Sequence, residues 1–131
     1  MTAALDEIRL VIPAEEDFRP IAHLVAGGLA LRLDLTYDDL EDLQVAIEAL
    51  LGLRDDENDV VVSLGPGDHA LRTAVGPFGE EAVRELEADR GELGLRRVLE
   101  TVSDSFEIER RNDGVWVELT KKFAATAEGA G

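Results

Sequence analysis

The chain has 131 residues, of which 45% are hydrophobic, and it contains no cysteine. This length suits one domain with a single core, and the lack of cysteine excludes disulfides and thiolate metal sites. A formal charge of −16 repels phosphate backbones and anionic lipid, so we expect no direct binding of nucleic acid or membranes. The charge either suits a basic protein partner or only keeps the protein in solution. No apolar run is long enough to span a membrane and the first residues lack a secretory pattern, so we expect a cytoplasmic protein.

The first elements predicted along the chain are a strand and a helix. Residues 8–12 alternate before Pro13, which predicts a short strand that ends at the proline. Apolar residues then recur at spacings of three and four, which predicts an amphipathic helix over about 15–33. The pair Gly27–Gly28 weakens this helix.

The second helix is the element that the sequence predicts most clearly. Thr36 with Asp39 three positions later resembles a capping box, and the apolar stripe that follows runs over 40–51. An acidic loop comes next, in which Asp55, Glu57 and Asp59 alternate as the first ligands of a calcium loop do. The later positions of such a loop do not match, so we expect no metal site there.

Two hairpins are predicted in the second half. Residues 60–62 and 70–75 flank a Gly-Pro-Gly-Asp turn, and residues 106–109 and 115–119 flank an Asn-Asp-Gly turn. Both turns suit antiparallel neighbours. The hairpins therefore predict a mostly antiparallel sheet.

Helical segments lie between the hairpins. Residues 80–89 predict a short helix or a mobile segment, and residues 95–102 carry a helical stripe. The whole order predicts an α+β fold, a two-layer sandwich with helices packed on one face of the sheet. We expect one domain over 1–123 and a disordered tail over 124–131.

Two phrases of this sequence resemble a known family over roughly residues 6–123. They are Asp42-Leu43-Gln44-Val45-Ala46-Ile47-Glu48-Ala49 and Gly91-Glu92-Leu93-Gly94-Leu95-Arg96. They resemble the second long helix and the glycine-rich lid of the anti-sigma regulatory factors, which are serine-protein kinases among the histidine kinase-like (GHKL, Bergerat-fold) ATPases. The resemblance implies a cleft for ATP between these two segments.

The resemblance also implies which residues would act on the nucleotide. Glu48 matches the glutamate that activates the reacting group, so it is the candidate catalytic residue. The magnesium-binding asparagine of the family is Gly52 here, and the adenine-binding aspartate, two residues before Gly76, is Ala74. A threonine on the penultimate strand of the family is Val115. The nucleotide-binding motifs are therefore degenerate.

The lid is the part that matches best. Glycines allow close backbone approach to a phosphate, and a helix N-terminus offers free amides. The candidate cofactor-binding residues are Gly76, Gly91, Gly94, Leu95 and Arg96. The alternative for the lid residues is a plain helix start.

These matches predict a regulatory protein-binding module with lost or impaired ATP binding and no expected cofactor. Losing a metal ligand and a base contact, at about 1.5–3 kcal/mol each, lowers affinity about a hundredfold or more. Its partner would be a sigma factor or an anti-anti-sigma protein, and a homodimer is possible because members of the family dimerise. The alternative is an active kinase that uses ATP and Mg to phosphorylate an anti-anti-sigma protein, with Asp55 or Asp56 as metal ligand. A third possibility is an unrelated small ligand in the same cleft.

Three aromatic or imidazole side chains complete the candidates. His23 and His69 lie far apart in the sequence and predict no pair. In a regular strand Trp116 points to the opposite face from Val115 and Val117, away from the predicted helices. It is interpreted either as an exposed interface anchor or as a tryptophan covered by its neighbours.

Overall fold

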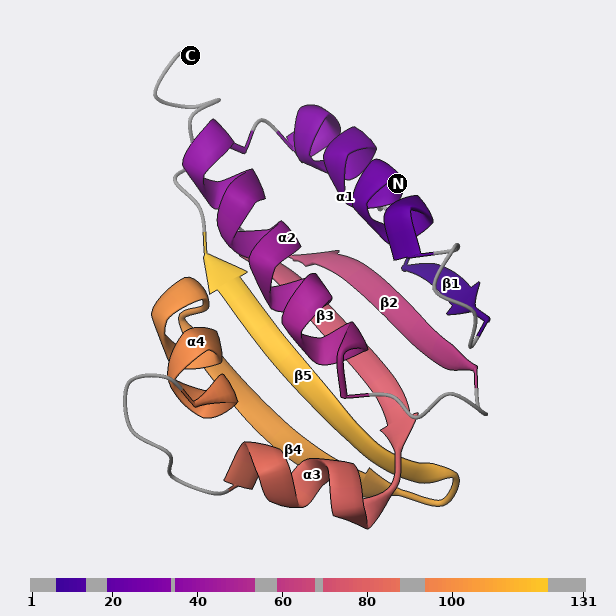
Figure 1. The fold of residues 1–131 in the computed structure, drawn as a ribbon. Helices are drawn as coiled ribbons and strands as arrows, with labels where there is room; N and C mark the ends of the chain where they lie inside the picture. Colours follow the sequence, from indigo (N-terminus) through magenta and orange to yellow (C-terminus); the bar gives the residue numbers. More distant parts are fainter. Residues whose placement is uncertain are drawn as a thin grey trace.

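A five-stranded antiparallel sheet with four helices on one face makes up the part of the chain that the structure, a computed structural model, describes (Figure 1). The described residues are 7–13, 19–33, 35–53, 59–67, 70–87 and 94–122. This architecture confirms the predicted α+β sandwich. Residues 91–93 of the glycine-rich phrase and the predicted tail lie outside the described residues.

The sheet has the strand order β1-β2-β3-β5-β4, and each neighbouring pair is antiparallel. Both predicted hairpins are present, as β2–β3 and β4–β5. β1 and β4 form the two edges of the sheet. The strands are β1 (Ile8–Ile12), β2 (Val60–Gly67), β3 (Ala70–Phe78), β4 (Ser105–Arg111) and β5 (Gly114–Lys122).

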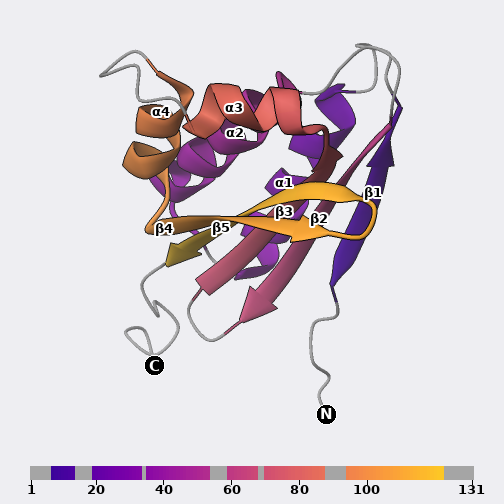
Figure 2. The same cartoon turned by 90° about the horizontal axis from the view of Figure 1, so that it is seen from below.

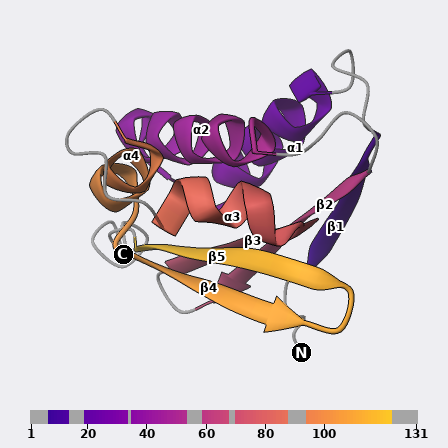
Figure 3. The same cartoon turned by 60° about the horizontal axis from the view of Figure 1, so that its bottom comes forward.

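The helices form the second layer (Figures 2 and 3). They are α1 (Arg19–Leu33), α2 (Tyr37–Leu51), α3 (Glu80–Glu87) and α4 (Leu95–Val102). The backbone N–H of Asp39 donates to Oγ1 of Thr36 at 3.0 Å, which confirms the predicted start of α2. α1 continues through its glycine pair, and none of the described helices has the length and hydrophobicity needed to cross a membrane.

The core lies between the sheet and the helices. Val62, Val75 and Val117 stand opposite one another on adjacent strands and are fully buried. They belong to one cluster with Ile47 and Leu50 of α2. The register therefore identifies which strand residues face the helices.

A charged contact joins the start of α2 to the end of β5. Nζ of Lys121 lies 3.0 Å from Asp42 and 3.8 Å from Asp39. Partial burial opposes the charge of Lys121, but the hydrogen bond to Asp42 and the charges of Asp42, Asp39 and Asp104 outweigh it. Together they raise the pKa of Lys121 above its ordinary value of 10.5.

We expect this contact to make stability depend on alkaline pH. Because the pKa of Lys121 is higher in the folded state, its charge stabilises the fold below pH 10.5, and this contribution is lost as the pH rises through the folded pKa. The difference in free energy of unfolding between the wild type and Lys121→Met should stay constant from about pH 7 to about pH 10 and then shrink. Urea denaturation at several pH values measures it. Lys122→Met, which removes an exposed side chain, is the control; an equal pH dependence there would contradict the assignment.

Candidate functional site

Glu48, the candidate catalytic residue, lies on α2 and its side chain reaches α1. Its Oε1 forms a hydrogen bond of 2.8 Å with Nε2 of His23, and the Glu48 side chain is 48% exposed. No sequence signal predicts this pair, because the two residues are 25 positions apart and lie on different helices. The catalytic role of Glu48 stays a prediction. The hydrogen bond between Glu48 and His23 joins α2 to α1.

Gly52, at the position of the metal-binding asparagine, ends α2. It has φ −68° and ψ −15°, and its N–H donates to the carbonyl of Glu48 at 3.1 Å. Any residue can adopt this conformation. The glycine is therefore not required by the backbone, and an asparagine would fit without backbone strain.

The sheet register places Ala74 on the face away from the helices. Ala74 stands opposite Ser63 and Glu118, whereas its neighbour Val75 belongs to the row that packs under α2. A carboxylate at Ala74 would therefore point away from the helical layer. Of Ala74 and Val75, it is Val75 whose side chain lies on the face of the sheet that packs against α2.

Gly76 lies against the indole ring of Trp116. A Cβ atom at Gly76 would lie 2.6 Å from Cδ2 of Trp116, much closer than atoms pack. The register of β3 and β5 shifts between Val75 and Phe78, which brings this part of β3 over Trp116. The close contact explains the glycine without a ligand, and cofactor binding by Gly76 stays a prediction.

Trp116 is on the predicted face but is only 3% exposed, so its interpretation as an exposed interface anchor is wrong. Its Nε1–H donates to Oδ1 of Asp113 at 2.9 Å. The guanidinium of Arg111 lies 4.5 Å from the ring centroid, a cation–π contact. These neighbours cover the ring because the β4–β5 turn brings Arg111 and Asp113 back to the strand that carries it.

The described part of the predicted lid is the start of α4. Gly94 is the N-cap in an extended conformation, and its carbonyl accepts from the backbone of Arg97 and Val98. The side chain of Arg96 pairs with Glu100 one turn later at 3.3 Å. Gly91 lies outside the described residues. Phosphate binding by Gly91, Gly94, Leu95 and Arg96 stays a prediction.

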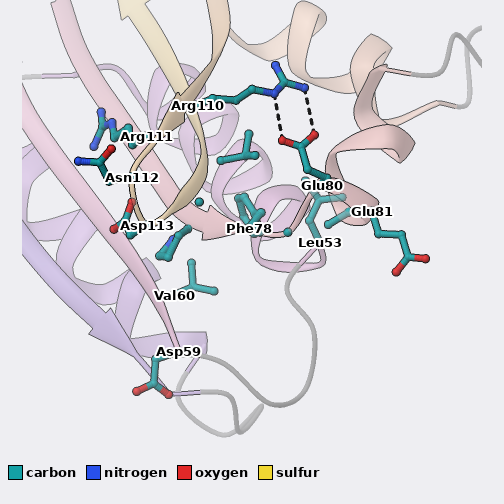
Figure 4. A pocket seen from close by; sticks show the side chains of 15 residues that line it. Leu53, Asp59, Val60, Phe78, Glu80, Glu81, Arg110, Arg111, Asn112 and Asp113 are labelled. Carbon is teal, nitrogen blue, oxygen red and sulfur yellow. Dashed lines mark hydrogen bonds and ion pairs between the residues drawn. The ribbon is translucent and has the colours of Figure 1, made fainter.

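A cavity of about 910 Å³ opens where the end of β3 meets the β4–β5 turn (Figure 4). We call it the turn cavity. Val115, at the position of the family threonine, lines it, and so do Leu53 and Pro77, which are direct neighbours of Gly52 and Gly76. Glu48 is not among its lining residues, nor are Gly76 and the described lid residues.

Gly114 closes the turn next to this cavity. Its φ of +143° is one that L side chains rarely adopt, and a Cβ there would lie 2.7 Å from that of Pro77. Val115, at the position of the family threonine, is buried in the core. Gly114 and Val115 therefore each have a structural reason for the residue type found there.

α3 packs against α4 and strand β5. Val83 and Leu86 are fully buried and belong to the same core cluster as Ile47 and Leu99. The other face of α3 carries exposed charges, so the helix is amphipathic. Its buried face packs in the core against α4 and β5.

An arginine of β4 holds α3 by its exposed face. Arg110 donates two hydrogen bonds to Glu80, at 3.0 and 3.2 Å (Figure 4). It also pairs with Glu87 at 3.5 Å. The hydrogen bonds from Arg110 lower the pKa of Glu80 below its usual value. The sequence does not predict the ion pair between Arg110 and Glu80, because the two residues are 30 positions apart.

No group of three or more metal-ligating side chains occurs among the residues that the structure describes. Asp55, Asp56 and Glu57 lie outside them. Asp59 is described and lines the turn cavity. A metal site at Asp55 or Asp56, as the kinase alternative requires, stays a prediction.

The comparisons with known proteins give two kinds of similarity. No protein-family model matches the chain. It is 31% identical to the serine-protein kinase RsbW of Bacillus velezensis, over 92% of this chain and 88% of the relative, and 28% identical to RsbW of Halalkalibacterium halodurans, over 88% and 83%. A crystal structure of the RsbU and RsbW domains of a Mycobacterium tuberculosis protein matches with a TM-score of 0.64 at 18% identity, over 91% of this chain and 32% of that one. That structure shows a shared fold, and this chain spans about a third of its length.

Proposed function

Since this chain belongs to the RsbW family of serine-protein kinases, we propose that it is an anti-sigma regulatory module that holds a protein partner and has lost or impaired ATP binding. The partner would be a sigma factor or an anti-anti-sigma protein. Binding a partner needs a stable surface and no nucleotide chemistry. The observation that carries the proposal is the core packing of α3, whose Val83 and Leu86 are fully buried in the same core cluster as Ile47 of α2.

The substituted positions support the same proposal. Gly52 offers no side-chain oxygen to a hard cation, and Val75, which faces α2, offers no acceptor to an adenine amino group. Phosphoryl transfer depends on metal neutralisation of developing charge, so it loses more than binding does. The proposal needs no cofactor.

The second candidate function is the active kinase. The names of the relatives favour it, because each is a serine-protein kinase. In this case the chain would bind ATP and Mg and phosphorylate an anti-anti-sigma protein. Glu48 would be its base, although its carboxylate is hydrogen-bonded to His23.

Calorimetry with ATP and magnesium separates the two candidates. We expect a dissociation constant weaker than about 100 µM for this chain, whereas RsbW of Bacillus velezensis serves as the positive control. Tighter binding by this chain would favour the kinase. The pair Gly52→Asn with Ala74→Asp should not restore binding, because a carboxylate at Ala74 points to the far face of the sheet. Co-purification from cells that returns no sigma factor and no anti-anti-sigma protein would contradict the regulatory role.

We also propose that the chain forms a homodimer through one edge of the molecule. Leu24 and Leu31 of α1 are 75% and 82% exposed, and Val11 of the neighbouring edge strand β1 is 63% exposed (Figure 1). The exposed leucines of α1 suit burial against a second copy, whereas Val11 points to the opposite face of the sheet, because its neighbours Leu10 and Ile12 face the core. Light scattering should give the dimer mass for the wild type and the monomer mass for Leu24→Glu with Leu31→Glu. A monomeric wild type would contradict the dimer.

A further inference from the structure

The floor of the turn cavity is apolar. Phe78 and Val60 are buried at its base, and Ala82 comes from the first turn of α3. The remaining apolar lining residues are Leu53, Pro77 and Val115. A cavity of about 910 Å³ is at the upper end of the size range of ligand pockets. It therefore has room for more than one side chain.

The rim of the cavity is acidic. Four of its lining residues carry carboxylates, and two carry guanidinium groups (Figure 4). The four acids are Asp59, Glu80, Glu81 and Asp113, and the two bases are Arg110 and Arg111. The rim carries an excess of negative charge.

The two arginines of the rim are already paired inside the protein. Arg110 binds Glu80 and Glu87, and Arg111 lies 2.6 Å from Glu109 and stacks on Trp116. Within the described ranges, no lysine or arginine forms an ion pair with Glu81 or Asp113, although Asp113 accepts from Trp116. A positively charged partner would therefore find unneutralised carboxylates, whereas an anion would find arginines that are occupied.

The start of α3 at the same rim does not offer an anion site. A helix N-terminus attracts negative charge, but the first turn of α3 already carries Glu80 and Glu81. Their carboxylates repel a phosphate. Nucleic acids and nucleotides are thus disfavoured at this rim.

We propose that the turn cavity is the docking site for a peptide segment of the protein partner in which an apolar side chain stands between lysine or arginine residues. The apolar side chain lies on the floor formed by Phe78 and Ala82, and the basic residues face Glu81 and Asp113. The charge complementarity between a basic segment and this rim selects the occupant. This inference rests on the proposed function and names the chemistry of its partner.

Short peptides test the cavity without knowledge of the partner. The probe is acetyl-Arg-Arg-Leu-Arg-Arg-amide, and its controls carry glutamate in place of each arginine or serine in place of leucine. Backbone amide shifts of the labelled protein should move at Gly79, Ala82 and Gly114 on addition of the probe. Both control peptides should bind more weakly, the acidic one without measurable shifts.

Matched protein variants locate the charge effect. Glu81→Lys is expected to lower the affinity for the probe peptide about fivefold at low salt, because it reverses a charge on the rim. Glu107→Lys makes the same charge change on β4 outside the cavity. It is expected to lower the affinity for the probe peptide less than about twofold. Ala82→Phe fills the floor and should abolish the preference for the leucine probe over the serine peptide. The two lysine variants change exposed residues, so they test the site even if Ala82→Phe does not fold.

Several outcomes would overturn the inference. They are equal binding of the acidic peptide, amide shifts confined to α1, equal effects of Glu81→Lys and Glu107→Lys, and absence of binding. The outcome for the proposed function is separate, since it is decided by calorimetry with ATP and by co-purification. If a sigma factor co-purifies with Glu81→Lys in the same amount as with the wild type, the regulatory role stands. The turn cavity is then not the site where the sigma factor binds.

Discussion

Replacing Gly76 with alanine is expected to lower the free energy of unfolding by about 1–3 kcal/mol, and most of this loss should disappear in a protein that lacks Trp116. The reason is the close contact of the two residues. An added Cβ would lie 2.6 Å from Cδ2 and 2.8 Å from Cγ of Trp116. The ring cannot move easily, because Asp113 and Arg111 hold it.

A double-mutant cycle measures this coupling. Urea denaturation followed by circular dichroism is applied to the wild type, Gly76→Ala, Trp116→Ala and the double variant. Trp116→Ala alone should cost about 3–5 kcal/mol, as for other buried aromatic residues. Gly79→Ala is the control, because a Cβ at Gly79 meets no atom within 4 Å. Additive losses from Gly76→Ala and Trp116→Ala would show that the glycine is required by another contact, such as the carbonyl oxygen of Val115, which lies 3.0 Å from the added Cβ.

The second large effect is expected from the buried face of α3. Leu86→Ala should lower the free energy of unfolding by about 2–5 kcal/mol, because Leu86 is fully buried in the main core. A cavity left by the truncation would be only partly filled by its neighbours. The same substitution should increase the rate of amide hydrogen exchange along α3.

Arg84→Ala is the matched control on the exposed face of the same helix. It should change the free energy of unfolding by less than about 0.5 kcal/mol. A loss below about 1 kcal/mol for Leu86→Ala would show that α3 contributes little to the core. The core packing of α3 would then no longer support the proposed function, and the kinase alternative would gain support.

The expected effects of these substitutions bear on how residues that match the family pattern are interpreted when the neighbouring ligand-binding residues are replaced. Gly76 matches the family pattern, yet contacts inside the protein, with the ring of Trp116 and the carbonyl oxygen of Val115, account for its lack of a side chain. Glu48 also matches, and its described contact is with His23. Matching residues can thus be retained by packing, so a match by itself does not establish nucleotide binding.

The sequence by itself determined most of the secondary structure, the two hairpins and the fold class, but it left residues 80–89 open between a short helix and a mobile segment, where the structure has the helix α3. Thr36 and the apolar stripe of α2 are local signals, and the two turn sequences lie next to the strands that they join, so spacing along the chain was sufficient. The sequence also determined the family resemblance, which the RsbW relatives confirm.

Only the tertiary structure decided what surrounds the candidate site residues. Strand alternation predicted the face of Trp116, but the residues that cover it depend on the β4–β5 turn and on the register shift in β3. The pairing of His23 with Glu48, and the orientation of Ala74 away from α2, likewise depend on how separate elements meet. The physical reason is that contacts between residues far apart in sequence are fixed by register and by packing of the whole core, and no local spacing encodes them.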